Sequence, residues 1–216
     1  MTLTAFFLIF LSVFLHAGWN FLSKVGRPSF AFYGLMALTS TCLMSPFLLF
    51  FDVGLGEMSP RFWLLLLCSG VSELLYEQGL CRAYRRCDIS LAYPMVRALP
   101  VLLVAVVTIL FGIGKTPGPM ALTGMLVVMV GCLLMPLRRL TDFRISAYVN
   151  PALGAMLLAA VGTTGYTVLD SLALAELIAA GKSSRLLCCC AYLCMIEFQI
   201  AVGIFVYVWR HPREQV

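Results

Sequence analysis

The fold is decided by FWLLLLCSGVSELLYEQGL (residues 62–80) and ISLAYPMVRALPVLLVAVVTILF (residues 89–111), two apolar runs within the stretch from Arg61 to Gly112. Each run is long enough to cross a bilayer, since a membrane helix needs about 20 mainly apolar residues. Each also carries charge inside its apolar span: Glu73 and Glu77 in the first, Arg97 in the second. Ionisable groups in hydrocarbon normally face a bundle interior or a watery cavity. The two runs therefore predict a polar path inside a membrane bundle.

The composition agrees with a membrane protein. Of the 216 residues 62% are hydrophobic and 12% are charged, whereas charged residues make up about a quarter of soluble globular chains. The mean hydropathy is +0.98. Although the net charge is +5, the 15 Lys and Arg residues lie mostly in short segments between apolar runs, which favours a topological role over nucleic-acid binding. We expect an all-α polytopic membrane protein with the lipid bilayer as a partner and no nucleic acid.

The cysteine and histidine content predicts no metal site. Most of the nine cysteines fall within apolar runs, where cysteine behaves as a small hydrophobe. There is no CxxC pair, and the two histidines are His16 and His211. Cys188, Cys189 and Cys190 cover nearly a full helical turn of directions, so we interpret them as lipid-facing or core-facing filler. No cofactor is expected.

Seven runs are long enough to be spans, and short connections rich in turn residues separate them. The first run has no preceding Lys or Arg and is too long for a signal peptide, so we expect a retained span. The predicted spans are residues 3–22, 30–51, 61–81, 89–112, 119–137, 151–174 and 186–209.

Lys and Arg in the connections predict the orientation, because cytoplasmic loops carry the excess. Ten lie on one side and four on the other, which puts the N-terminus outside and the C-terminus in the cytoplasm. The larger set is Lys24, Arg27, Arg82, Arg85, Arg86, Arg138, Arg139, Arg144, Arg210 and Arg213; the smaller is Arg61, Lys115, Lys182 and Arg185.

A weak internal repeat relates HAGWNFLSK (residues 16–24) to TTGYTVLDS (residues 163–171). Aligning Gly18 with Gly165 places Trp19 on Tyr166 and a polar residue near the end of each segment. The two segments lie in the first and sixth spans, so the second copy starts from the opposite face of the membrane. Inverted repeats of this kind are typical of many secondary transporters.

These segments, with DISLAYPMVRALPVLL (residues 88–103) and GYTVLDSLAL (residues 165–174), resemble the EamA-type members of the drug/metabolite transporter superfamily. The chain is also similar to the EamA-like permeases associated with phosphonate utilisation. The resemblance implies ten helices in two inverted five-helix repeats around a central substrate cavity. This sequence departs from that pattern by stopping after seven spans, with one full repeat at 1–140 and two helices at 141–216. We expect either a truncated product or a chain completed by another copy or subunit.

Ionisable residues from three spans are predicted to converge near mid-membrane. With a rise of about 1.5 Å per residue, Glu73 lies roughly 18 Å from the outer surface, and Arg97 and His16 lie at a similar level. Glu73 and Glu77 are one turn apart on one helix face, where they could contact protons or substrate or instead pair with Arg97. For Glu77 a position at the lipid interface is a third alternative.

Arg97 follows Tyr93 by one turn and lies between Pro94 and Pro100, which can kink the helix and free carbonyl groups. A guanidinium suits a carboxylate or a phosphate-like substrate because its planar fork binds two oxygens, but a permanent partnership with Glu73 is equally open. The remaining candidate residues for the cavity are His16, Trp19, Asn20, Tyr166 and Glu197.

Other features have alternative interpretations. Trp19 could belong to the interfacial aromatic belt, and Asp170 could be interfacial. Ala155, Ala159 and Thr163 form a stripe of small residues that favours close helix packing. Gly114-Lys115-Thr116 is rejected as a P-loop because Ile109 stands where a glycine is required.

We therefore predict a secondary permease or exporter of small organic solutes in the bacterial inner membrane, working by alternating access and without enzymatic chemistry. The alternative is an incomplete or accessory, non-transporting membrane subunit, and a homo-oligomer or a completing subunit is a possible partner. A membrane-embedded enzyme is a third hypothesis, because a paired Glu and His could do acid-base chemistry, but no GxSxG or HExxH motif supports it.

Overall fold

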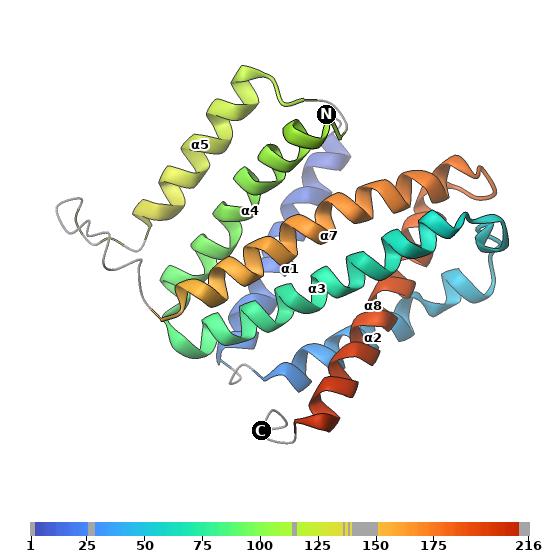
Figure 1. Cartoon of the computed structure of the whole chain (residues 1–216), viewed down its shortest axis with the longest axis horizontal. Coiled ribbons are helices and arrows are strands. Elements are labelled where there is room, and N and C mark those ends of the chain that lie inside the picture. Colours follow the sequence, from blue (N-terminus) through green and yellow to red (C-terminus); the bar gives the residue numbers. More distant parts are fainter. Residues whose placement is uncertain are drawn as a thin grey trace.

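The computed structural model describes residues 3–25, 29–113, 116–135, 137, 139 and 151–211, and these residues form helices and connections without any strand. Figure 1 shows the arrangement. The helices are α1 (Leu3–Val25), α2 (Phe30–Leu49), the short 3-10 helix η1 (Leu55–Glu57), α3 (Pro60–Arg86), α4 (Ile89–Phe111), α5 (Pro119–Leu134), α7 (Leu153–Ala179) and α8 (Arg185–Arg210).

Six of these helices are long and apolar enough to cross a membrane, so the chain is a multi-pass membrane protein. They are α1, α2, α3, α4, α7 and α8. The fifth predicted span is shorter than expected, because α5 has 16 residues and ends at Leu134. The third is longer: α3 continues through the predicted basic segment to Arg86, where Arg85 and Arg86 complement the negative end of the helix dipole.

The centre of the molecule is the antiparallel pair of α3 and α7, which run side by side across the middle of Figure 1. Their backbones touch. A Cβ atom on Gly79 would lie 2.5 Å from the Ala159 nitrogen, and one on Gly162 would lie 2.5 Å from the Tyr76 nitrogen. Ala155 and Ala159 are buried, so the predicted small-residue stripe is where α3 packs.

Side-chain contacts join both ends of the α3–α7 pair. At one end the Ser59 hydroxyl donates to the Glu176 carboxylate, and at the other Arg86 Nη1 donates to the Pro151 carbonyl at 3.3 Å. We call the first the η1 end and the second the Cys87 end, after the residue that follows α3. The two helices therefore span the same depth.

α2 and α8 form a second pair, with α8 also packed against α3. Phe30 and Tyr207 meet edge to face with ring centroids 5.3 Å apart, and a Cβ on Gly34 would collide with Ile204. At the η1 end, Lys182 Nζ lies 2.7 Å from Glu57 Oε1, and this hydrogen bond raises the pKa of Lys182. The contact ties η1 to the connection between α7 and α8.

α4 packs against α7, and α5 lies antiparallel beside α4 (Figure 1). α1 is held mainly by its last turns, where the Lys24 ammonium donates to the carbonyl of Tyr84 and, at 3.0 Å, to that of Cys87. Most of the earlier large apolar residues of α1, from Leu3 to Leu15, are exposed on the surface of the bundle. A lipid environment suits such a surface.

Several predicted features lie outside the described residues. They are Arg27, Gly114, Lys115, Arg138, Arg144, Arg213 and the proposed boundary between residues 140 and 141.

Candidate functional site

Arg97 lies in the interior of the bundle, on α4 between two buried prolines. Its Nη2 donates to the Tyr76 hydroxyl at 3.3 Å, and its guanidinium carbon lies 5.8 Å from the centre of the Tyr93 ring. The Tyr76 ring in turn meets the Tyr166 ring edge to face at 5.6 Å. Tyr76 thus holds the Arg97 cation by a hydrogen bond and Tyr93 by cation–π attraction, and Tyr166 packs behind Tyr76.

A cavity of about 500 Å³ opens beside Arg97 between α4, α5 and α7. Its polar groups are the Arg97 guanidinium and the hydroxyls of Thr163, Tyr166 and Thr167, and the rest of its wall is apolar. Ligand pockets in proteins commonly combine an apolar wall with a few such polar groups. The cavity is large enough for a small organic solute.

Three predicted site residues carry buried polar atoms that have no hydrogen-bond partner within the described residues: His16 Nε2 on α1, Glu77 Oε2 on α3 and Arg97 Nε on α4. The charge of Arg97 acts on both of the other two. A buried polar atom without a partner costs about 1–3 kcal/mol. Three such atoms in one region indicate a site that accommodates polar groups.

Arg97 and Glu73 do not form an ion pair; in the described part of the chain the one ion pair is that of Lys182 with Glu57. The charges that act on Glu73 are instead the carboxylates of Glu77, Glu197 and Asp170. The interior position of Glu73 is therefore not explained by a permanent ion pair with Arg97 that holds the helices together. Glu77 differs, because Arg97 acts on it as an opposite charge.

The predicted stripe on α1 forms a hydrogen-bonded network. Trp19 Nε1 donates to His16 Nδ1 at 3.2 Å, and the Asn20 amide donates to the His16 carbonyl at 2.8 Å. The hydroxyl of Tyr84 donates to Asn20 Oδ1 at 2.8 Å, which links α1 to α3. Trp19 packs edge to face against Tyr33 at 6.2 Å, so it contacts the bundle and not only the lipid interface.

Asp170 occupies an interior position that the sequence did not reveal. Its Oδ1 accepts from the hydroxyl of Tyr192 on α8 at 2.6 Å and from that of Ser69 on α3. Two side chains from neighbouring helices bind its carboxylate, so Asp170 takes part in the contacts between α3, α7 and α8. The spacing of Ser69, Glu73 and Glu77 at four residues was a usable signal, since it marks one polar face of α3.

Glu197 lies on α8, where its negative charge acts on Glu73 and Glu77 of α3 and Ser40 of α2 lies near its carboxylate. It is therefore brought to the carboxylates of α3 and not to Arg97. The predicted site residues fall into three neighbouring groups. These are the carboxylates (Glu73, Glu77, Glu197), the surroundings of Arg97 (Tyr93, Arg97, Tyr166) and the α1 network (His16, Trp19, Asn20).

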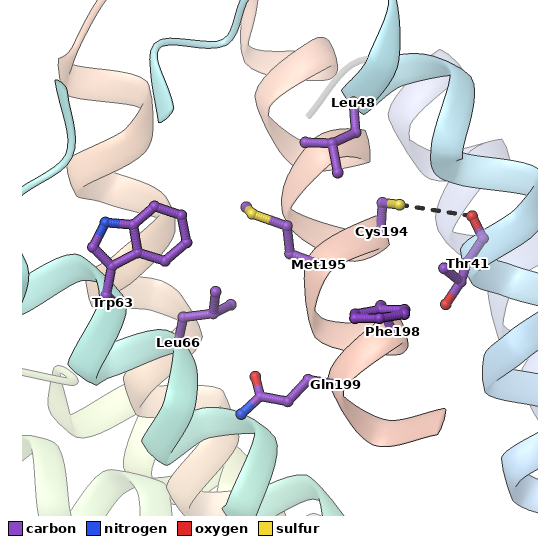
Figure 2. A pocket seen from close by; sticks show the side chains of 8 residues that line it. All are labelled: Thr41, Leu48, Trp63, Leu66, Cys194, Met195, Phe198 and Gln199. Atoms are coloured by element: carbon purple, nitrogen blue, oxygen red, sulfur yellow. Dashed lines mark hydrogen bonds between the residues drawn. The ribbon is translucent and has the colours of Figure 1, made fainter. Parts of the chain in front are cut away.

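A second cavity, of about 400 Å³, lies between α2, α3 and α8 and contains none of the predicted site residues. Figure 2 shows that Trp63 and Leu66 face Met195 and Phe198 across it, with the Gln199 amide pointing toward α3. That amide donates to the Leu67 carbonyl at 3.2 Å, and Cys194 Sγ donates to the Thr41 carbonyl at 3.6 Å. The Thr41 hydroxyl likewise donates to the Ala37 carbonyl, and most of the remaining side chains of this wall are apolar.

Among the described residues no group of three His, Cys, Asp or Glu side chains could hold a metal ion. Cys188 is buried, Cys189 is exposed and Cys190 is intermediate, so these three side chains point in different directions.

No family model, curated protein or solved structure matches the chain. The function is therefore inferred from the geometry of the site.

Proposed function

We propose that the protein is a secondary transporter, a permease or exporter, that moves small organic solutes across the membrane by alternating access. The observation that carries this proposal is the gathering of unpartnered buried polar atoms from α1, α3 and α4 around Arg97. A purely structural bundle gains nothing from such atoms, whereas a solute with polar groups can satisfy them during passage.

The Arg97 cavity favours an anionic or zwitterionic solute. Arg97 supplies a guanidinium that can bind two oxygens of a carboxylate or phosphonate, and Tyr166 adds a hydroxyl that can donate to the same group. The apolar remainder of the wall suits a short carbon skeleton. An amino acid-like metabolite or an alkylphosphonate fits this description.

The inverted-repeat organisation of the EamA-type transporters is part of the proposal. The alignment of Gly18 with Gly165 places Ser23 on Asp170, and each of these polar residues hydrogen-bonds a tyrosine on the helix that follows its own. Ser23 lies 3.2 Å from the Tyr33 hydroxyl, and Asp170 accepts from Tyr192. The shared contact supports a common origin for the α1–α2 and α7–α8 units.

We further propose that the protein resides in a bacterial inner membrane with the Cys87 end in the cytoplasm. Described basic residues cluster at that end: Lys24, Arg82, Arg85, Arg86 and Arg210. Cytoplasmic loops carry the excess of Lys and Arg, which supports this orientation with the N-terminus outside.

Uptake by proteoliposomes tests the proposal, with radiolabelled amino acids and alkylphosphonates as probes. We expect uptake by the wild-type protein and a loss of about tenfold or more in Arg97→Ala, because a hydrogen bond to a charged group contributes about 1.5–3 kcal/mol. Glu73→Gln should also lower uptake. Glu57→Gln, at an exposed ion pair, is the matched control that should transport normally. If Arg97→Ala and Glu73→Gln both take up solute at the wild-type rate, the assignment of Arg97 and Glu73 to the transport site is wrong.

The alternative is an accessory membrane subunit that does not transport on its own. The exposed N-terminal part of α1 favours it, because that surface could pack against another membrane helix as well as against lipid. The mass of the detergent-solubilised complex distinguishes the two. A stable hetero-complex without uptake activity of the isolated chain supports the subunit, and uptake by the isolated chain excludes it.

A further inference from the structure

A small hollow lies at the Cys87 end, where the end of α3 meets the start of α2 and the end of α8. It is lined by Phe30 of α2, by Gln78, Cys81, Arg82 and Arg85 of α3 and by Tyr207 of α8. Its volume is about 10 Å³, which is room for one group of the size of a water molecule or a phosphate oxygen. The hollow is separate from both cavities described above.

The polar side chains around this hollow are donors that lack acceptors. Gln78 and Arg82 form no side-chain hydrogen bond within the described residues, and no Asp or Glu is among the described residues that line the hollow. A guanidinium only donates, and the NH2 group of an amide donates as well. At the same end basic side chains outnumber the one described acidic side chain, that of Asp88. The hollow therefore suits a ligand that brings negative charge and several acceptor oxygens, such as a phosphate group.

The face of α3 that carries these donors continues toward the middle of the membrane as an exposed apolar strip. The side chains of this face recur every three or four residues, a spacing that keeps them on one side of a helix. In chain order they are Leu64, Leu67, Val71 and Leu75, followed by Gln78, Arg82 and Arg85. The four apolar side chains are between 39% and 60% exposed, and the strip that they form is about 17 Å long at the rise of an α-helix. One face of α3 therefore offers apolar surface inside the membrane and guanidinium groups at its edge.

The position of the hollow along the helices corresponds to the level of lipid headgroups. Arg85 is one residue from the end of α3, Tyr207 is three residues from the end of α8, and Phe30 begins α2. Headgroups occupy the region just outside a hydrocarbon core of about 30 Å. Trp209 is exposed beside Tyr207, which is typical of the aromatic belt at this level. Long arginine side chains can bring their charges to lipid phosphates from this depth.

We propose that this end of α3 binds an anionic phospholipid. One phosphate oxygen enters the hollow, the guanidinium groups of Arg82 and Arg85 bind the other oxygens, and an acyl chain lies along the strip from Leu75 to Leu64. The apolar strip favours a lipid over a soluble phosphate compound, which would leave that surface unused. Because α2, α3 and α8 all line the hollow, the lipid joins α3 to the α2–α8 pair. The inference depends on the membrane setting of the chain and not on transport.

Native mass spectrometry of the full-length protein, delipidated in a neutral detergent, tests the proposal. The probes are phosphatidylglycerol, phosphatidylcholine with the same acyl chains, and glycerol 3-phosphate. We expect the wild-type protein to bind phosphatidylglycerol most tightly, because choline adds a positive charge that the arginines repel and glycerol 3-phosphate has no acyl chain. Arg82→Gln should weaken the binding of phosphatidylglycerol about fivefold, which is the contribution of one basic residue at an anionic membrane surface. Arg61→Gln, the matched control, removes the same charge from the exposed start of α3 and should bind like the wild type.

An Arg82→Gln protein that binds phosphatidylglycerol as tightly as the wild type overturns the proposal. Equal losses in Arg82→Gln and Arg61→Gln also overturn it, because they would show a general attraction to positive charge. Phosphatidylcholine bound as tightly as phosphatidylglycerol excludes an anionic lipid, and glycerol 3-phosphate bound as tightly shows a site for a soluble phosphate compound instead. If Arg82→Gln does not fold, Arg82→Lys replaces it. An ammonium lacks the planar fork of a guanidinium, so weaker binding is expected and unchanged binding contradicts the proposal.

Discussion

Tyr84 joins α3 to α1 through two separate contacts of a single buried residue. Its side chain is fully buried on α3, its hydroxyl donates to Asn20 Oδ1 on α1 at 2.8 Å, and its carbonyl accepts from the Lys24 ammonium. Asn20 is itself 1% exposed, so no water replaces a lost partner. The attachment of α1 to the bundle therefore depends on a few polar contacts in one small region.

We expect Tyr84→Phe to destabilise the protein by about 1–3 kcal/mol, because the substitution leaves the buried Asn20 oxygen without its donor. Thermal unfolding in detergent measures the change. Tyr207→Phe is the control, since the Tyr207 hydroxyl makes no hydrogen bond within the described residues and its ring is kept. Equal unfolding temperatures for the two variants would contradict this role of Tyr84.

At the scale of elements, the packing of α3 against α7 differs in kind from the other contacts. Glycines on both helices let the two backbones meet, whereas α2 and α8 are separated by side chains such as Phe30 and Tyr207. In a membrane, where apolar side chains gain little from leaving lipid, such close van der Waals packing is a main source of helix association. The contact at Gly79 should therefore be sensitive to one added methyl group.

Gly79→Ala should lower the free energy of unfolding by about 1–3 kcal/mol, because its Cβ would overlap the backbone of Ala159. Gly124→Ala on α5 is the matched control, since nothing lies within 4 Å of a Cβ at that position. Chemical denaturation in detergent gives both values. If the two substitutions have equal effects, the close approach of the helices is not important for stability.

The sequence could predict the helices themselves, because their positions depend on the local composition of the chain. Apolar runs of span length located the helices, and charges within those runs located Glu73, Glu77 and Arg97. Pairing between helices was not predictable, because it depends on which small residues face one another across an interface. For that reason the partners of Asp170 were missed. The length of α5 was also missed, because the apolar run continues past Leu134 where the helix ends.

At the scale of the whole molecule, the topology follows from the α3–α7 pair. α4 begins at the Cys87 end and runs away from it, yet α7 begins again at that end, where Arg86 reaches the Pro151 carbonyl. The chain must therefore return across the membrane between Phe111 and Pro151. α5, with 16 residues and a length of about 24 Å, is the described helix in this interval and lies antiparallel to α4 (Figure 1).

We expect reporter fusions to place Thr116 and the N-terminus on one side of the membrane and Arg139 and the C-terminus on the other. The physical reason is that seven crossings put the two ends on opposite faces. Alkaline phosphatase, active outside the cytoplasm, and green fluorescent protein, fluorescent inside, report the sides. A fusion at Arg139 on the same side as one at Thr116 would mean that α5 does not cross.

The direct contact of the α3 and α7 backbones limits how the bundle can change shape. The backbones of α3 and α7 are in contact at Gly79 and Gly162, and hydrogen bonds link the two helices at both ends. We therefore expect the pair to move as one rigid unit. Shearing them past each other would drive the Tyr76 and Ala159 main chains into the facing helix. If the protein is the transporter proposed above, we expect its change between outward-open and inward-open states to leave the α3–α7 pair intact and to move other helices, α1 above all, relative to it.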